Sequence, residues 1–238
     1  MSRANKENLV RYTQNLKKYI TTCISPLHGA VEKRVTTAIF DITTANTTIT
    51  LKNLGDNVSI DWGDGTTNSS MNHTYTTTGT FTCKIYNLRV IGKEAFRECT
   101  ALVSIVIGTG ITWENHRQFY GCTSLKSVVI EEGATSIGYA DDTSRQTFQN
   151  CTSLTSVKLP KSLTAICNSA FKGCTALTSI VIPRNVTEIG AGAFHDCPKL
   201  SIFCQAKSKL DGWDSIWNSS NCFTVWDAGN IIVDDGEL

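Results

Sequence analysis

The sequence lacks the residue patterns on which most enzymes depend. It contains only four histidines, His28, His73, His116 and His195, and none of them stands beside a nucleophile in a recognisable motif. A glycine-rich phosphate-binding loop is also absent from the sequence. We therefore predict a protein that is not an enzyme, with no catalytic residues and no cofactor.

An excess of charge of one sign is also missing from the chain as a whole. The 22 lysines and arginines nearly balance the 21 aspartates and glutamates, which gives a formal net charge of +1. This balance favours neither nucleic acid nor an anionic membrane surface as a partner. The exception is residues 1–34, which hold seven basic and two acidic residues. We interpret them as a separate N-terminal element.

Long hydrophobic runs and targeting motifs are absent as well. No stretch approaches the roughly 18 consecutive apolar residues of a membrane-spanning helix, so we predict no membrane insertion. Glu7, Arg11 and Gln14 interrupt the N-terminus where a signal peptide would have its apolar core. The ending DAGNIIVDDGEL carries no lipidation or cell-wall anchor motif. Unless export sequences have been removed, we expect the chain to stay in the cytoplasm, or to leave by lysis or inside a larger particle.

The ten cysteines do not have the spacing of metal ligands. There is no CxxC pair, and no histidine accompanies the cysteines at the spacing of a zinc site. Five of them recur at one position of a repeated phrase, where we expect a reduced, buried thiol that packs as a small apolar side chain. Cys204 and Cys222 flank the last segment, and they are the pair best suited to a disulfide if the chain forms one.

A phrase that begins with phenylalanine occurs five times. It reads FRECTALVSIVI from Phe96 and FKGCTALTSIVIP from Phe171, and a more divergent copy, FHDCPKLSIF, begins at Phe194. Its cysteines are separated by 23, 29, 23 and 23 residues, and a fixed period in this range is typical of a stacked repeat. We expect the short strands to stack on one another around internal columns. The columns are Phe96, Phe119, Phe148, Phe171 and Phe194; Cys99, Cys122, Cys151, Cys174 and Cys197; and Leu102, Leu125, Leu154, Leu177 and Leu200.

Residues 35–88 have the composition of a β domain. TTAIFDI, TTITLKN, VSIDWGDG and TFTCKIYN are rich in threonine and β-branched residues, and turn residues separate them. This region resembles the PKD-like β-sandwich domains of bacterial surface proteins, through WGDGT from Trp62, HTY from His73 and GTF from Gly79. Asp61 and Asp64 could hold calcium or could hydrogen-bond the turn, and we favour the turn.

Residues 5–24 show the spacing of an amphipathic helix. Its apolar residues recur at intervals of three and four, as in a coiled-coil seam, and Pro26 ends the segment. A helix this short is marginal in water, so its seam must pack against a partner. The partner is either further copies of the helix, in a homotrimer, or the β region of the same chain. The seam consists of Leu9, Tyr12, Leu16, Tyr19 and Cys23.

The repeat unit VTEIGAGAFHDCPKL resembles the BspA-type leucine-rich repeats of bacterial, protozoan and viral surface proteins. The ending, with Trp213, Trp217, Cys222 and Trp226, resembles the segment that often closes such arrays. The resemblance implies adhesion or receptor binding outside a cell. We predict a mainly β fold in four parts: a short N-terminal helix in 1–34, a small PKD-like β-sandwich in 35–88, a leucine-rich-repeat solenoid in 89–200, and a C-terminal cap and tail in 201–238.

The second and third repeat units depart from the common pattern. The second reads ITWENHRQF where other units have small residues, and the third carries six extra residues within GYADDTSRQTF. Stacking would place both departures on one edge, and aromatic and arginine side chains are enriched in recognition surfaces. Drift in a tolerant loop is the alternative explanation. The predicted ligand-binding residues are Trp113, Glu114, His116, Arg117, Tyr139, Asp141, Asp142 and Arg145.

A second candidate surface is the outward row of strand residues Val106, Val129, Lys158 and Val181. If exposed, these valines would form an apolar binding strip. They could equally pack against the preceding β region, and we favour that packing.

These features predict a receptor-binding or adhesion protein located outside the cell or on a particle surface. The leading hypothesis is a component of a phage tail or similar particle that recognises a protein or glycan on a host surface. It is motivated by surface-type modules in a chain without a recognisable export signal. The alternative is a bacterial cell-surface or secreted structural protein whose export signal is not in this sequence.

Overall fold

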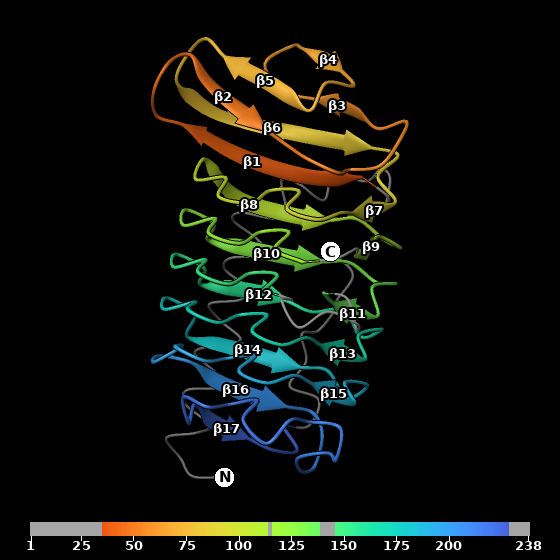
Figure 1. Ribbon diagram of the computed structural model, residues 1–238, viewed down its shortest axis with the longest axis vertical. Helices are drawn as coiled ribbons and strands as arrows, with labels where there is room; N and C mark the ends of the chain where they lie inside the picture. Colours follow the sequence, from red (N-terminus) through yellow and green to blue (C-terminus); the bar gives the residue numbers. More distant parts are fainter. Residues whose placement is uncertain (1–34, 114–115, 139–145, 229–238) are drawn as a thin grey trace.

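The computed structural model describes residues 35–113, 116–138 and 146–228 (Figure 1). These residues form strands and turns, and no helix occurs among them. Accordingly, none of the described residues belongs to a helix that could cross a membrane. The helix predicted for residues 5–24 lies outside the described residues.

Residues 36–86 form six antiparallel strands. The strand β1 pairs with β6, β6 pairs with β3, β3 pairs with β4, and β2 pairs with β5 in a separate two-stranded sheet. Burial alternates at the end of β1, where Phe40 and Ile42 are buried and Asp41 is exposed, because successive side chains point to opposite faces. The strands are β1 (Thr36–Ile42), β2 (Thr47–Thr50), β3 (Ser59–Asp61), β4 (Thr67–Asn68), β5 (Asn72–Tyr75) and β6 (Gly79–Tyr86).

The repeats stack as parallel strands in two ladders, and residues at the same repeat position pair directly, as in Ile105↔Val128↔Val157. Figure 1 shows the long ladder continuing from β12 to β14, where no strand pairing connects them. The long ladder contains β8 (Leu102–Ile107), β10 (Ser127–Ile130), β12 (Ser156–Lys158), β14 (Ser179–Ile182), β16 (Ser201–Cys204) and β17 (Phe223–Val225). The short ladder contains β7 (Val90–Ile91), β9 (Thr112–Trp113), β11 (Ser136–Ile137), β13 (Ala165–Ile166) and β15 (Glu188–Ile189).

The first six strands continue the repeat array without a break in the sheet. The strand β1 pairs antiparallel with β8, with Thr37 opposite Val106, so that one seven-stranded sheet runs β12-β10-β8-β1-β6-β3-β4. One hydrophobic cluster likewise extends from Ala38 to Trp217. The pairing hides the edge of the first repeat strand, which would otherwise expose unpaired backbone groups.

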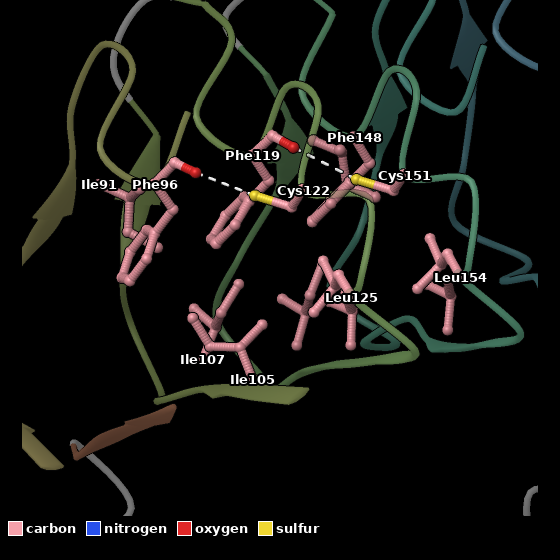
Figure 2. Packing of buried hydrophobic residues seen from close by; sticks show 14 of the residues in the cluster. Ile91, Phe96, Ile105, Ile107, Phe119, Cys122, Leu125, Phe148, Cys151 and Leu154 are labelled. Atoms are coloured by element: carbon pink, nitrogen blue, oxygen red, sulfur yellow. Dashed lines mark hydrogen bonds between the residues drawn. The ribbon is translucent and has the colours of Figure 1, made fainter. Parts of the chain in front are cut away.

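The predicted phenylalanine column forms the centre of the array. All five rings are fully buried, and neighbouring rings lie 4.9 to 5.6 Å apart and within 12° of parallel. The leucine column is buried beside them, with no member more than 3% exposed. Figure 2 shows the rings of Phe96, Phe119 and Phe148 in line, with Leu125 and Leu154 below them. The columns predicted from the period of the sequence are confirmed.

The cysteine column has a polar role as well as a packing role. The thiols of Cys122 and Cys151 donate hydrogen bonds to the carbonyl oxygens of Phe96 and Phe119, one unit earlier, at 2.9 and 3.2 Å (Figure 2). The Phe119 oxygen also accepts the backbone N–H of Cys122. The thiol therefore occupies the second acceptor site of a buried carbonyl, which alanine or valine could not do. Cys174 and Cys197 repeat this contact at 3.2 and 3.1 Å.

We predict that these thiols are reduced and unreactive in the folded protein. All nine described cysteines are free, and eight of them are buried. Burial raises the pKa of Cys99 to about 11 and that of Cys197 to about 12, so little reactive thiolate exists near neutral pH. Iodoacetamide should spare the eight buried thiols in the native protein and, after denaturation without reductant, modify all nine described cysteines, which peptide mapping distinguishes from Cys23, the tenth cysteine of the chain. Mass spectrometry counts the adducts, and fewer than five reactive column thiols after denaturation would contradict the packing described above.

The C-terminal cap imitates a further repeat. The strand β17 pairs in parallel with β16, and the ring of Trp217 lies 6.0 Å from Phe194, in the next place of the phenylalanine column. The thiol of Cys222 lies 4.0 Å from the Phe194 oxygen, the acceptor that matches the cysteine column, and 3.5 Å from the Cys197 oxygen. Trp213 closes the end, with its ring 5.0 Å from Trp217.

A disulfide between Cys204 and Cys222 does not form, because both are free thiols. The pairing of Ser201 with Phe223 explains why. Cys222 precedes its strand, whereas Cys204 ends the neighbouring one, so they are offset by about four residues, or roughly 13 Å along the strand direction. A disulfide needs Cα atoms within about 7 Å.

Candidate interaction surface

Trp113, predicted to contact a ligand, belongs instead to the core. Its side chain is 5% exposed, and its ring lies 6.2 Å from Phe119 and 6.1 Å from Phe148. The reason is its register: Trp113 pairs with Ile91 in the short ladder, where Ile137 and the following units also place an inward isoleucine. The indole thus replaces an isoleucine of the repeat, and we correct the prediction that it lies on the surface.

Arg117 and His116 lie at the edge of the second unit and are half-buried. The Nε of Arg117 donates a hydrogen bond of 2.8 Å to Oε1 of Gln146, a residue of the third unit. The backbone carbonyl of His116 accepts the N–H of Glu94, from the unit before. The structure therefore brings the edges of three successive units together at this place.

The structure adds Tyr120 to this edge. Two guanidinium groups lie near its ring, with the Cζ atom of Arg97 at 5.7 Å and that of Arg117 at 5.6 Å from the ring centroid. Asn150 donates a hydrogen bond of 3.4 Å to the phenol oxygen. Cation–π contacts of this kind hold the ring and both cations in a defined arrangement. We call Arg97, Arg117, Tyr120, Gln146 and Asn150 the arginine–tyrosine cluster.

Two carboxylates balance the charge of Arg97. Its Nη1 atom lies 2.9 Å from Glu94 and its Nη2 atom lies 3.3 Å from Glu98. Burial alone would raise the pKa of Glu94, but the hydrogen bond and charge of Arg97 outweigh it, so the pKa is lowered. The edge therefore carries charges of both signs, because Arg97, which lies beside Tyr120, is paired with two carboxylates.

Tyr120 could have been found from the sequence by a different alignment. The residue directly after each column phenylalanine lies in one row along this edge, because the phenylalanines themselves stack. The residue type changes from unit to unit along this row, whereas the column positions keep the same residue type, and such variation is typical of a surface position. It reads Arg97, Tyr120, Gln149, Lys172 and His195, all half-buried. The other predicted site residues, Glu114, Tyr139, Asp141, Asp142 and Arg145, lie outside the described residues.

The Asp61 and Asp64 carboxylates serve the WGDGT turn, as favoured from the sequence. Asp61 accepts the N–H of Gly63, and Asp64 accepts the N–H of Thr66, each at 3.0 Å. The other Asp64 oxygen lies 2.7 Å from Nε2 of His73, whose ring stacks on Trp62. Burial would raise the Asp64 pKa, but these hydrogen bonds lower it. Among the described residues, no group of three potential ligands is arranged to hold a metal ion.

The outward row of strand valines is not exposed. Val106, Val129 and Val181 are 7%, 2% and 9% exposed. The β region does not cover them, because β1 extends the sheet at its edge and does not lie over its face. The prediction of an exposed strip is therefore wrong. The β region meets this row at its end, where Thr37 lies opposite Val106.

Two parallel ladders around internal columns of phenylalanine, cysteine and leucine define a leucine-rich-repeat solenoid. The sequence model of the BspA type leucine rich repeat region matches residues 73–201 in six copies, which is more than half of the chain. The chain belongs to this family. No curated protein matches it.

Several solved structures resemble parts of the chain. A leucine rich cell surface protein from Faecalibacterium prausnitzii is 39% identical, with a TM-score of 0.45 over 52% of this chain and 32% of that protein. The T. pallidum leucine rich repeat protein is 28% identical, with a TM-score of 0.35 over 42% and 58%. A leucine-rich repeat protein from Bacteroides ovatus is 25% identical, with a TM-score of 0.37 over 59% and 42%. The chain spans less than two thirds of each of these proteins.

Proposed function

We propose that this protein is a non-enzymatic recognition protein that binds a receptor at a cell surface through the edge of its repeat array. The observation that carries the proposal is the arginine–tyrosine cluster, in which the guanidinium groups of Arg97 and Arg117 both lie within 6 Å of the Tyr120 ring. Membership of a family built on a repeat scaffold supports a binding role in preference to catalysis. The proposed location is outside the cell.

The cluster has the chemistry of a protein-binding surface. Tyrosine and arginine are the residues that most often dominate the binding energy of interfaces. Here contacts across adjacent units hold them in place, so little conformational entropy would be lost on binding. Paired charges of both signs favour a protein partner over a glycan, because an interface of proteins can complement each charge.

Several finer points are also proposals. The particle hypothesis places the protein in a phage tail or similar particle that recognises a host surface. The alternative is a bacterial cell-surface or secreted adhesion protein. Tail and lysis genes beside the gene would favour the first, and an upstream export signal would favour the second. Three further proposals concern the architecture. Residues 35–88 are proposed to be a PKD-like domain, and the chain is proposed to divide into residues 1–34, 35–88, 89–200 and 201–238. A homotrimer through the N-terminal helix is the third.

We expect Arg117→Ala and Tyr120→Ala each to weaken receptor binding by about 1 kcal/mol or more, because the first removes one cation–π contact and the second removes both. His116→Ala and Tyr139→Ala test the remaining predicted residues of the edge. Labelled protein is titrated onto receptor-bearing cells, with circular dichroism to verify folding. Lys207→Ala, at an exposed position beyond β16, is the matched control. Wild-type affinity in all four edge variants would remove the proposal.

A further inference from the structure

The two arginines of the arginine–tyrosine cluster differ in how their charge is balanced. Both terminal nitrogens of Arg97 are used within the chain, because Nη1 lies 2.9 Å from Glu94 and Nη2 lies 3.3 Å from Glu98. The side chain of Arg117 makes one hydrogen bond with the described residues, from Nε to Oε1 of Gln146 at 2.8 Å. The amide of Gln146 is neutral, so within the described part of the chain no carboxylate balances the charge of Arg117.

The guanidinium group of Arg117 is nevertheless held in position. Gln146 of the third unit fixes its Nε atom, and its Cζ atom lies 5.6 Å from the centroid of the Tyr120 ring. Arg117 is half-buried, so part of its hydration is already removed. The hydrogen bond at Nε leaves the N–H donors of the two terminal nitrogens for a ligand. A guanidinium group in this state is suited to a carboxylate, which it can bind through two parallel hydrogen bonds.

The backbone at Arg117 has a conformation that the repeat forms without an arginine. The residue two positions before the column phenylalanine has a positive φ in all five units: 58° at Glu94, 61° at Arg117, 20° at Gln146, 53° at Ser169 and 60° at Gly192. Glycine adopts this left-handed conformation without the strain that a side chain adds. In the first unit the side chain at this position pairs with Arg97. In the second unit a carboxylate from outside the described residues would give the arginine the equivalent partner.

We propose that Arg117 is an anion-binding residue of this edge, and that it takes the carboxylate of an aspartate or glutamate side chain of a protein partner. This inference rests on the proposed function and names the chemistry by which the edge recognises its receptor. An anion at Arg117 also offsets the repulsion between the two guanidinium groups near the Tyr120 ring.

The charges beside Arg117 favour an acidic residue of a protein over an acidic glycan. Glu98 belongs to the same edge, where its side chain is 60% exposed and its backbone N–H donates a hydrogen bond of 2.7 Å to the carbonyl of Tyr120. A glycan with a carboxylate on each sugar would bring further negative charge toward Glu98. A protein segment can place one carboxylate at Arg117 and a neutral or basic residue at Glu98, so it complements both charges.

Peptide display on the full-length protein tests the proposal. A library of random peptides is selected on the wild type and, in parallel, on Arg117→Gln. We expect the peptides enriched by the wild type to share an aspartate or glutamate at one position, and Arg117→Gln should not enrich that position. Arg184→Gln, at an exposed arginine of a different turn, is the matched control and should select the same peptides as the wild type. The absence of a shared acidic position, or its enrichment on Arg117→Gln as well, would overturn the proposal.

A double-variant cycle measures the contact itself. The selected peptide is compared with its amide counterpart, in which the acidic residue is exchanged for asparagine or glutamine. Arg117→Gln and the amide exchange should each weaken binding by about five-fold or more, and together by little more than either alone, because they remove the same contact. Arg117→Lys keeps the charge without the paired donors, so it should recover only part of the affinity. Additive losses in variants that circular dichroism shows to be folded would contradict the proposal.

Two other results would assign Arg117 a different partner and would each overturn the proposal. A hexamer of galacturonic acid is the glycan probe. If it binds more tightly than the selected peptide and loses this affinity in Arg117→Gln, the residue recognises an acidic glycan. Amide exchange at Glu114, Asp141 and Asp142 asks whether the chain neutralises Arg117 itself, and a gain of about five-fold or more in peptide affinity would show that it does.

Titration onto receptor-bearing cells separates failure of this inference from failure of the proposed function. Receptor binding that weakens in Tyr120→Ala but not in Arg117→Gln would overturn the carboxylate contact and keep the edge as the receptor site. Wild-type receptor binding in both variants, with acidic peptides still selected through Arg117, would remove the proposed function and retain the anion-binding residue.

Discussion

Replacing Phe148 with alanine is expected to lower the free energy of unfolding by about 3–5 kcal/mol, the usual cost of truncating a buried phenylalanine. Phe148 is fully buried at the centre of the column, 5.0 Å from Phe119 and 5.4 Å from Phe171. It also contacts the edge of the Trp113 indole. The stacked backbones on either side are joined by hydrogen bonds and cannot collapse into the space, so the cavity would persist.

Guanidinium denaturation measures this loss, with the slope of the transition compared between variants. Phe223→Ala is the matched control, because Phe223 is 52% exposed at the end of the array and should change stability by no more than about 0.5 kcal/mol. A loss below about 1 kcal/mol for Phe148→Ala would mean that the column does not hold the units together.

The repeat period allowed the internal columns to be predicted because each column depends on one position of a local unit. Phe171 and Cys174 can be read as core residues from their recurrence alone, whatever the rest of the chain does. Turn chemistry is equally local, which is why the roles of Asp61 and Asp64 in the WGDGT turn followed from three or four residues.

The features that the sequence did not reveal depend on pairings between distant segments. Nothing near Thr37 indicates that β1 pairs with Val106, about 70 residues later, in place of packing over it. Trp113 was misplaced because its neighbours suggested an irregular loop, whereas its register in the short ladder makes it the counterpart of Ile91. Tyr120 was overlooked because its significance comes from Arg97 and Arg117, which belong to different units.

The two ends of the array are closed in different ways. At the first unit, β1 pairs with β8 and continues both the sheet and the core into the β region. At the last unit, the cap repeats the pattern once more and then ends it with tryptophans, whose rings cover the final layer. The first arrangement continues the sheet into further strands, whereas among the described residues the cap has a neighbouring unit on one side only. The C-terminal end should therefore be the weaker of the two.

Trp213→Ala is accordingly expected to destabilise the last units more than the rest of the array. Trp213 is 2% exposed, its ring lies 5.5 Å from Trp226, and its Nε1 donates a hydrogen bond of 3.3 Å to the carbonyl of Val186. A local loss of about 3–5 kcal/mol corresponds to faster amide exchange by about 100-fold or more.

Hydrogen exchange with mass spectrometry locates this loss along the chain. In a stacked array each unit is stabilised by its nearest neighbours, so exchange in Trp213→Ala should accelerate in β16 and β17 and stay near the wild-type rate in β8 and β10. Ile216→Ala is the matched control within the cap, because Ile216 is 56% exposed and its truncation removes little buried contact. Equal acceleration of amide exchange from β8 to β17 would show instead that the array opens as one cooperative unit. In that case the seven-stranded sheet and the single core would transmit the loss of stability at the cap to the first repeat.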